Sequence, residues 1–265
     1  SLNNKNRSDK FVKSKKKIIS LLKKIKLENI SIKYRNKKYF APRTVTELKK
    51  IIKNYPNSIF LSGGTDLSLI VTKERKDIDN IISLSSINEL NFIEEKNEHI
   101  VVGAATSLRE FELFIKKYYP DFTAILKRYG SVQIRNVATI AGNIATASPI
   151  GDTLPLLLSL DAKVVLQGLN KKTILPLKNF FVNYRKTKLK KRQFIHSIII
   201  PVLKKNIFKA YKISKRIDDD ISSVCASFSL EIKNKKIKNI KIAYGGMAST
   251  PKRAINCEKI LINKN

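Results

Sequence analysis

The chain has 265 residues, of which 43% are hydrophobic, and a formal net charge of +32 at pH 7. This length and apolar content allow two domains with hydrophobic cores and exclude a disordered protein, and no apolar run approaches the about 20 residues that span a bilayer. The charge favours nucleic-acid or polyanion binding as one alternative, but lysine is spread along nearly the whole chain and no aromatic or zinc-finger motif of nucleic-acid-binding proteins accompanies it.

The N-terminal region, residues 1–35, is predicted to be a basic linker with one amphipathic helix, Phe11–Ile25. Apolar residues recur there at helical spacing, and the polar face is almost purely lysine. Residues 1–40 carry 14 basic and 2 acidic side chains, a local net charge of +12. A solvated linker explains this charge, and contact with an acidic partner is the alternative.

From Tyr39 onward, helical and strand-like patterns are mixed, which predicts a globular domain over residues 36–203. The expected helices are Val45–Lys53, Ser107–Lys116, Asp121–Tyr129 and Thr153–Leu160. The expected strands are Ser58–Leu61, Ile81–Leu84, Asn91–Ile93, His99–Val102, Ala162–Gln167 and Ile195–Ile200. Residues 204–265 are predicted to begin a second α+β domain, with strands Ile207–Ser214, Ser222–Ile232 and Ile237–Tyr244 and a helix after Pro251.

A Ser-Gly-Gly-Thr-Asp segment, residues 62–66, directly follows the first expected strand of the globular domain. Two consecutive glycines allow positive φ angles, so successive N–H groups can point into one concavity and bind an anion such as a diphosphate. Thr65 adds a hydroxyl donor, whereas Asp66 would repel phosphate and is better placed near a hydroxyl or a backbone amide. A tight turn without a ligand is the alternative, because the motif is neither GxGxxG nor a P-loop.

The second candidate segment, Arg135–Leu157, is rich in small and polar residues and is predicted to be a ligand-binding loop. Such residues bury little area, but they let the backbone approach a bound molecule closely. Donor groups fall within ten residues at Thr139, Gly142, Asn143, Thr146 and Ser148.

Asp152 inside this segment and Tyr129 before it each have a structural and a functional interpretation. Asp152 stands at an expected helix start, where it is either a plain N-cap or a ligand contact. Tyr129, at the end of the preceding helix, is either an ordinary core or surface aromatic or a platform that stacks on a flat heteroaromatic ring.

Five stretches together resemble the FAD-binding region of the molybdenum hydroxylases, most closely that of the small subunit of bacterial xanthine dehydrogenases. In chain order they are KYFAPRTVTEL (residues 38–48), FLSGGTDLSLIVTK (60–73), RYGSVQIRNVATIAGNIATASPIGDTLPLL (128–157), LPLKNFFVNYRKT (175–187) and KIAYGGMASTPKRA (241–254). The resemblance covers residues 36–265. It implies an α+β, two-lobed FAD-binding fold of the vanillyl-alcohol oxidase and p-cresol methylhydroxylase type, followed by a small α+β C-terminal domain.

The same resemblance implies which residues contact FAD. The first loop would wrap the diphosphate and ribityl group, the second would surround their oxygens, Asp152 would bind the nucleotide end, and an aromatic ring would lie at the adenine. The implied cofactor-binding residues are Phe60, Leu61, Ser62, Gly63, Gly64, Thr65, Asp66, Leu67, Tyr129, Thr139, Gly142, Asn143, Thr146, Asp152, Leu189 and Lys212. The family's flavin chemistry needs no protein nucleophile, so no catalytic residue is expected.

The implied function is internal electron transfer: electrons from purine hydroxylation at a molybdenum cofactor pass through iron–sulfur clusters to FAD and then to NAD. Cys225 and Cys257 cannot form a metal-ligand set, so the clusters and the molybdenum cofactor are expected in a missing segment or in partner chains. We therefore expect a cytoplasmic hetero-oligomer with a molybdenum-binding large subunit and an iron–sulfur domain. The alternative within the family is the medium subunit of a carbon monoxide or aldehyde dehydrogenase.

Three further expectations complete the sequence-based hypothesis. His99 and His196 lie outside both motifs, so FAD is expected to be bound noncovalently. The acidic run at residues 218–220 falls where relatives have a loop bordering the flavin ring, and it is expected either to influence the choice between NAD and oxygen or to be a solvated turn. The absence of cysteine-rich modules before residue 36 suggests that the chain is a fragment, with a stand-alone FAD subunit as the alternative.

Overall fold

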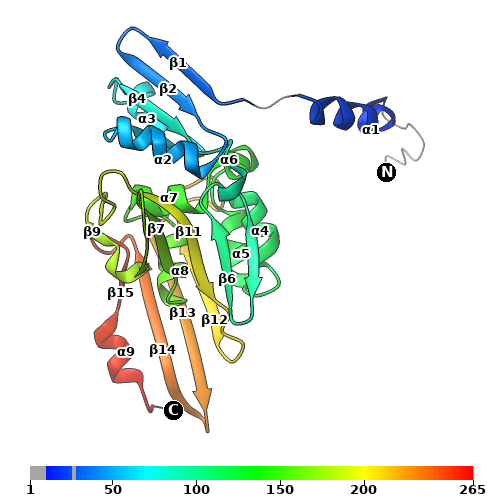
Figure 1. Ribbon diagram of the computed structural model, residues 1–265. Coiled ribbons are helices and arrows are strands. Elements are labelled where there is room, and N and C mark those ends of the chain that lie inside the picture. Colours follow the sequence, from blue (N-terminus) through cyan, green and yellow to red (C-terminus); the bar gives the residue numbers. More distant parts are fainter. Residues whose placement is uncertain (1–9, 26–27, 265) are drawn as a thin grey trace.

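A computed structural model describes residues 10–25 and 28–264 of the chain, which form an outlying helix, two α/β lobes and a C-terminal sheet (Figure 1). Helix α1 (Lys10–Lys23) confirms the predicted N-terminal helix and stands to one side of the first lobe in Figure 1. Among the described helices, none combines the length and the apolar character needed to cross a bilayer.

The first lobe is a four-stranded sheet in the order β1-β2-β4-β3. Its elements are β1 (Ile30–Tyr34), β2 (Lys37–Ala41), α2 (Val45–Asn54), β3 (Ile59–Leu61), α3 (Leu67–Thr72) and β4 (Asn80–Ser83). Helix α2 starts at a capping box, in which the Thr44 hydroxyl accepts a hydrogen bond from Glu47 N and the Glu47 carboxylate accepts one from Thr44 N. The helix buries Leu48 and Ile52 in a core that includes Ile82 of β4.

The second lobe is a five-stranded antiparallel sheet, β5-β6-β11-β7-β8, covered by helices. Its strands are β5 (Ile93–Lys96), β6 (His99–Gly103), β7 (Lys163–Gln167), β8 (Lys172–Pro176) and β11 (Phe194–Pro201), and its helices are α4 (Leu108–Ile115), α5 (Pro120–Lys127), α6 (Val132–Val137), α7 (Ile140–Thr146) and α8 (Thr153–Ser159). The 3₁₀ turns η1 (Asn88–Leu90) and η2 (Leu177–Asn179) and the short pair β9 (Phe181–Asn183) and β10 (Lys186–Thr187) connect these elements. Every residue of α8 is buried, because this helix packs on both the second lobe and the C-terminal sheet.

The C-terminal sheet is antiparallel, in the order β12-β13-β14-β15, with one helix. Its elements are β12 (Ile207–Ile213), β13 (Val224–Lys233), β14 (Lys236–Gly245), β15 (Lys252–Arg253) and α9 (Ile255–Leu261). Arg253 pairs with Glu258 at 2.6 Å and with Asp161, directly after α8, at 2.9 Å. The pair with Glu258 lies within the C-terminal unit, and the pair with Asp161 joins this unit to the second lobe at the end of α8.

The expected mixture of helices and strands is confirmed, but two local predictions were wrong. Residues 135–157 are not a loop, because Ser131 and Thr139 cap two short helices there by accepting hydrogen bonds from Ile134 N and Gly142 N. The segment also builds core, since its Ile and Leu side chains in α7 and α8 are fully buried. The second wrong prediction is the strand at Asn91–Ile93. Residues 88–90 form the turn η1 and β5 begins at Ile93, so only the last residue of the expected strand lies in a strand.

Candidate functional site

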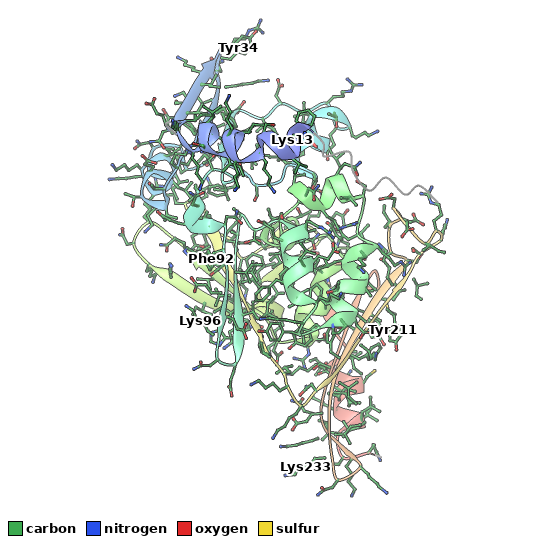
Figure 2. All side chains as sticks on the ribbon, turned by 90° about the vertical axis from the view of Figure 1, so that its right-hand side faces the viewer. Lys13, Tyr34, Phe92, Lys96, Tyr211 and Lys233 are labelled. Carbon is green, nitrogen blue, oxygen red and sulfur yellow. The ribbon has the colours of Figure 1, made fainter. Side chains whose placement is uncertain are left out.

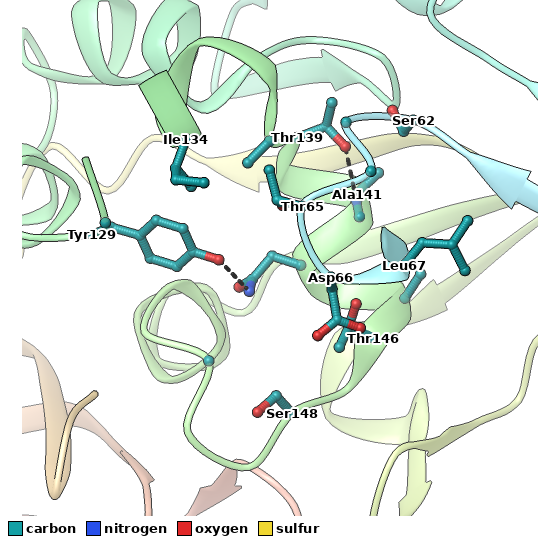
Figure 3. A pocket seen from close by; sticks show the side chains of 18 of the residues that line it. Ser62, Thr65, Asp66, Leu67, Tyr129, Ile134, Thr139, Ala141, Thr146 and Ser148 are labelled. Atoms are coloured by element: carbon teal, nitrogen blue, oxygen red, sulfur yellow. Dashed lines mark hydrogen bonds between the residues drawn. The ribbon is translucent and has the colours of Figure 1, made fainter. Parts of the chain in front are cut away.

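A cavity of about 630 Å³ lies where the two lobes meet the loop between β12 and β13. Its size is within the usual range for cofactor sites. All of the predicted cofactor residues except Leu61 line it, and Figure 3 shows side chains from the β3–α3 turn, the end of α5 and the α7 region around it. Neither histidine is among the lining residues. The structure therefore brings together segments that are more than 100 residues apart in the sequence.

The β3–α3 turn presents unbonded backbone donors to this cavity. Within the described chain, the N–H groups of residues 63–67 donate no hydrogen bond to another protein group. Gly64 has a φ of +73°, which explains one of the two glycines. Gly63 does not have a positive φ; a Cβ atom there would lie 2.0 Å from Val137 O, so this glycine permits close contact with the end of α6.

The α7 side of the cavity is held by hydrogen bonds of its own. Thr139 Oγ1 accepts from Gly142 N at 3.0 Å, which leaves the Thr139 hydroxyl proton able to donate to a ligand. Asn143 Nδ2 donates to the Tyr129 hydroxyl at 3.1 Å, and Asn143 Oδ1 accepts from the buried Thr153 hydroxyl at 2.5 Å. The orientation of Asn143 and Tyr129 is thus fixed within the protein.

Tyr129 forms an aromatic wall of the cavity (Figure 3). Burial raises the pKa of its hydroxyl to about 12; the negative charges of Asp152 and Asp66 act in the same direction, and the hydrogen bond from Asn143 opposes them. The phenol is therefore neutral at physiological pH.

Asp152 is part of a buried charged cluster rather than a plain N-cap. Its side chain makes no capping hydrogen bond. Instead Oδ2 pairs with Lys212 Nζ at 2.7 Å and Oδ1 accepts from the Ser222 hydroxyl at 2.5 Å. Lys212 Nζ also donates to Arg128 O at 3.1 Å. The cluster links the start of α8 to the C-terminal sheet beside the cavity.

The β12–β13 loop is fixed at the cavity by Arg128. The Arg128 guanidinium donates to Ile217 O, Lys212 O and the Ser214 hydroxyl at 2.9–3.0 Å. Two residues of the acidic run, Asp219 and Asp220, line the cavity. Asp220 also accepts hydrogen bonds from Arg216 N and Ile221 N, so it stabilises its own turn as well.

Sequence reasoning missed several lining residues and one ion pair. Asp66, expected near a hydroxyl or an amide, pairs with Arg185 at 2.8 Å, a residue 119 positions away that no local signal connects to it. Missed lining residues include Ile59, Leu84, Ala104, Ser131, Ile134, Ala138, Ala141, Ala145, Ile150 and Phe194. The missed residues from Ser131 to Ile150 lie within the motif at residues 128–157, so this motif could have been used to predict them as lining residues.

Comparisons with known proteins agree over most of the chain. A family model described as FAD binding domain in molybdopterin dehydrogenase matches residues 32–203, and one described as CO dehydrogenase flavoprotein C-terminal domain matches residues 209–265. The chain is 32% identical over 255 residues to xanthine dehydrogenase of Emericella nidulans, covering 91% of this chain and 19% of the relative. It is 33% identical over 236 residues to nicotinate hydroxylase hnxS of the same fungus, covering 80% of this chain and 17% of the relative.

The fold has solved counterparts. Carbon monoxide dehydrogenase from Hydrogenophaga pseudoflava matches with a TM-score of 0.81 and 25% identity, over 88% of this chain and 82% of that chain. Quinoline 2-oxidoreductase from Pseudomonas putida 86 matches in fold, with a TM-score of 0.80 and 19% identity, over 88% of this chain and 82% of that chain. The chain spans about a fifth of the length of the curated relatives it matches. On this evidence, the chain belongs to the FAD-binding flavoproteins of the molybdenum hydroxylase family.

Proposed function

We propose that the cavity binds FAD noncovalently through the residues inferred from the sequence. The observation that carries this proposal is the row of unbonded N–H groups at residues 63–67, which lie in the same cavity as the Thr139 hydroxyl. Such a row suits the oxygens of a diphosphate. Tyr129 supplies an aromatic face, and the buried Asp152–Lys212 pair supplies polar groups at the cavity wall, so the donor set fits a flavin dinucleotide.

FAD, when bound, supplies the redox chemistry, and the residues of this chain hold and orient it. The backbone donors of the β3–α3 turn would fix the diphosphate, and the Thr139 and Thr146 hydroxyls would contact the diphosphate and ribityl oxygens. The Asp152–Lys212 pair would hold the nucleotide end, and Leu189 would exclude water at the flavin. In this proposal no side chain of the chain acts as an acid, a base or a nucleophile.

We further propose that the chain is the flavin portion of a xanthine dehydrogenase-like complex that oxidises hypoxanthine or xanthine and reduces NAD. The molybdenum cofactor and the iron–sulfur clusters would be held by a large subunit and an iron–sulfur domain outside this chain. Identity to xanthine dehydrogenases over up to 92% of the chain supports this assignment. Asp219 and Asp220 at the cavity support a role for the acidic run in the choice between NAD and oxygen.

A second candidate is the flavin portion of another molybdenum hydroxylase. The identity of 33% to a nicotinate hydroxylase is as high as the identity to xanthine dehydrogenases. Anaerobic reduction of the native assembly by hypoxanthine, nicotinate or carbon monoxide, followed by addition of NAD, would separate these candidates. We expect hypoxanthine to bleach the flavin absorbance and NAD to restore it. If nicotinate or carbon monoxide bleaches the flavin and hypoxanthine does not, the purine assignment is overturned.

The FAD proposal itself has a direct test. The purified protein should show the visible absorbance bands of oxidised flavin, and acid precipitation should release all yellow colour into the supernatant. Colour retained in the pellet would contradict noncovalent binding. Absence of flavin, together with failure to take up added FAD, would favour the alternative of a basic polyanion-binding protein.

A further inference from the structure

A concentrated basic surface adjoins the cavity, formed by residues 181–192, which we call the basic hairpin. It comprises β9, β10 and the turn that follows. Residues 185–192 have the sequence RKTKLKKR, so six of eight residues are basic, against 53 of 265 in the whole chain. The lysine bias of the chain therefore does not account for this density. Residues 162–217, which include the hairpin, contain no Asp or Glu.

The cations of the basic hairpin are exposed and mostly unpaired. All six are exposed, and among the described residues only Arg185 forms an ion pair, with Asp66. Some lysines elsewhere on the described surface have acidic partners, for example Lys117 with Glu95 and Lys209 with Asp121. The local repulsion that five unpaired cations create is not neutralised within the described chain.

The backbone of the basic hairpin is fixed. Strands β9 and β10 pair with each other, and Lys188 N donates to Phe180 O at 2.9 Å. The next turn is closed by two hydrogen bonds between Lys190 and Gln193, from Gln193 N to Lys190 O and from Lys190 N to Gln193 Oε1, both 3.1 Å. The charges are therefore presented on a defined surface rather than on a free chain.

The position of the hairpin connects it to the proposed redox site. Leu189, between Lys188 and Lys190, lines the cavity, and Arg185 is tied to Asp66 of the β3–α3 turn. A molecule bound on the hairpin would thus lie at the edge of the cavity. Val182 and Tyr184, each 59% exposed on the same hairpin, add apolar and aromatic contact area of the kind found at protein interfaces.

We propose that the basic hairpin docks a small electron-carrier protein with an acidic face, an inference that rests on the proposed FAD site. A dinucleotide does not explain the surface, because its two phosphates need fewer than five cations. A nucleic acid does not explain the position of the surface, because it would make no use of the neighbouring cavity. Complementary charge steers such encounters and gives them a strong salt dependence.

The test uses the native assembly with its flavin and, as probe, an oxidised plant-type ferredoxin of net negative charge. Binding is measured by titration calorimetry at low and high salt. The variant Lys188→Glu/Lys190→Glu/Lys191→Glu is compared with Lys233→Glu/Lys235→Glu/Lys236→Glu, which changes the net charge equally at the far tip of the β13–β14 hairpin, where Figure 2 labels Lys233. We expect a loss of affinity of about 10- to 100-fold for the first variant, with flavin content unchanged, and wild-type affinity for the second.

Every other outcome contradicts the docking surface. Equal weakening by both variants would show a general effect of net charge, and undetectable binding to the wild type would exclude this class of carrier. A variant that binds ferredoxin normally but loses affinity for NAD would assign the surface to a dinucleotide. Failure of the FAD proposal would be seen separately, as an assembly without flavin in the wild type.

Discussion

At the scale of single residues, Gly63 is required for space rather than for an unusual φ angle. A Cβ atom would lie 2.0 Å from Val137 O and 2.7 Å from Ala138 Cα, and no side-chain rotation relieves a clash with backbone. We expect Gly63→Ala to lower the free energy of unfolding by about 1–3 kcal/mol and to reduce flavin retention, measured by urea denaturation and flavin absorbance. Gly168→Ala is the control, because its nearest contact would be 3.5 Å away. Equal stability of the two variants would contradict this account of Gly63.

Tyr129 should make stability depend on pH in alkaline solution. Its pKa is raised by burial to about 12 in the folded protein, against about 10 in an unfolded chain. Above pH about 10 the unfolded state loses this proton first, so stability falls as the pH rises from about 10 to about 12 and is unaffected at lower pH.

Denaturation midpoints over this range should therefore fall more steeply for the wild type than for Tyr129→Phe. Tyr34→Phe, at a residue 65% exposed, should behave like the wild type. An unchanged slope in Tyr129→Phe would show that the phenol is not buried as the structure has it.

At the scale of secondary-structure elements, a buried ion pair holds the turn that carries Tyr129. Arg135 of α6 lies 3.2 Å from Glu112 Oε2 of α4, and their side chains are 8% and 2% exposed. Arg135 Nη1 also donates to the carbonyl oxygens of Lys127, Tyr129 and Gly130 at 2.6–3.2 Å. One guanidinium thus joins α4 and α6 to the turn after α5.

Arg135→Gln should lower the free energy of unfolding by about 3 kcal/mol, because it removes the buried partner of Glu112 and the donor to three backbone carbonyl oxygens. It should also weaken flavin binding by displacing Tyr129. Arg109→Gln is the matched control: Arg109 contacts the same carboxylate at 2.7 Å but is 41% exposed and does not contact the turn, so a loss below about 1 kcal/mol is expected. Chemical denaturation and flavin titration measure both effects. Equal losses in the two variants would contradict the role assigned to Arg135.

The elements that could be predicted are those with a clear apolar period. Strand β7 has the apolar run Val164–Leu166 and β11 has three consecutive isoleucines, residues 198–200, and the capping box at Ser107 marks the start of α4. Helices α6 and α7 are too short to show such a period, with six and seven residues, and the sequence marks them mainly by the N-caps Ser131 and Thr139. Hairpin β1–β2 was missed although Ile30–Tyr34 alternates apolar and polar residues as a strand does, because these residues were assigned to the basic linker.

At the scale of the whole molecule, the cavity exists only because three distant parts of the chain meet. Its two small-residue motifs could be found in the sequence, and the family resemblance indicated that they share one ligand. The contacts that close the cavity could not be predicted from the sequence, because Lys212 and Asp152 are 60 residues apart and Arg185 and Asp66 are 119 residues apart. No local pattern determines such pairings. The Lys212–Asp152 pair follows from the packing of α8 on the C-terminal sheet, and the Arg185–Asp66 pair from the approach of the β9–β10 segment to the β3–α3 turn.

FAD binding should therefore protect three separated segments from hydrogen exchange at once. The N–H groups of residues 63–67 donate no hydrogen bond within the described chain, so they should exchange rapidly in the flavin-free protein and slowly once they donate to a diphosphate. The α7 region, residues 139–146, and the cavity-lining loop at residues 219–222 should gain protection in the same experiment, because they line the same cavity.

Hydrogen-exchange mass spectrometry of the protein with and without FAD measures this. Residues 233–236, at the far end of the β13–β14 hairpin (Figure 2), provide the internal control and should exchange equally in both states. Protection of these residues to the same extent would indicate general stiffening instead of contact. Protection of residues 139–146 without residues 63–67 would show that the β3–α3 turn does not hold the diphosphate. Because the three segments belong to different parts of the fold, their joint protection would mean that FAD couples both lobes to the C-terminal sheet.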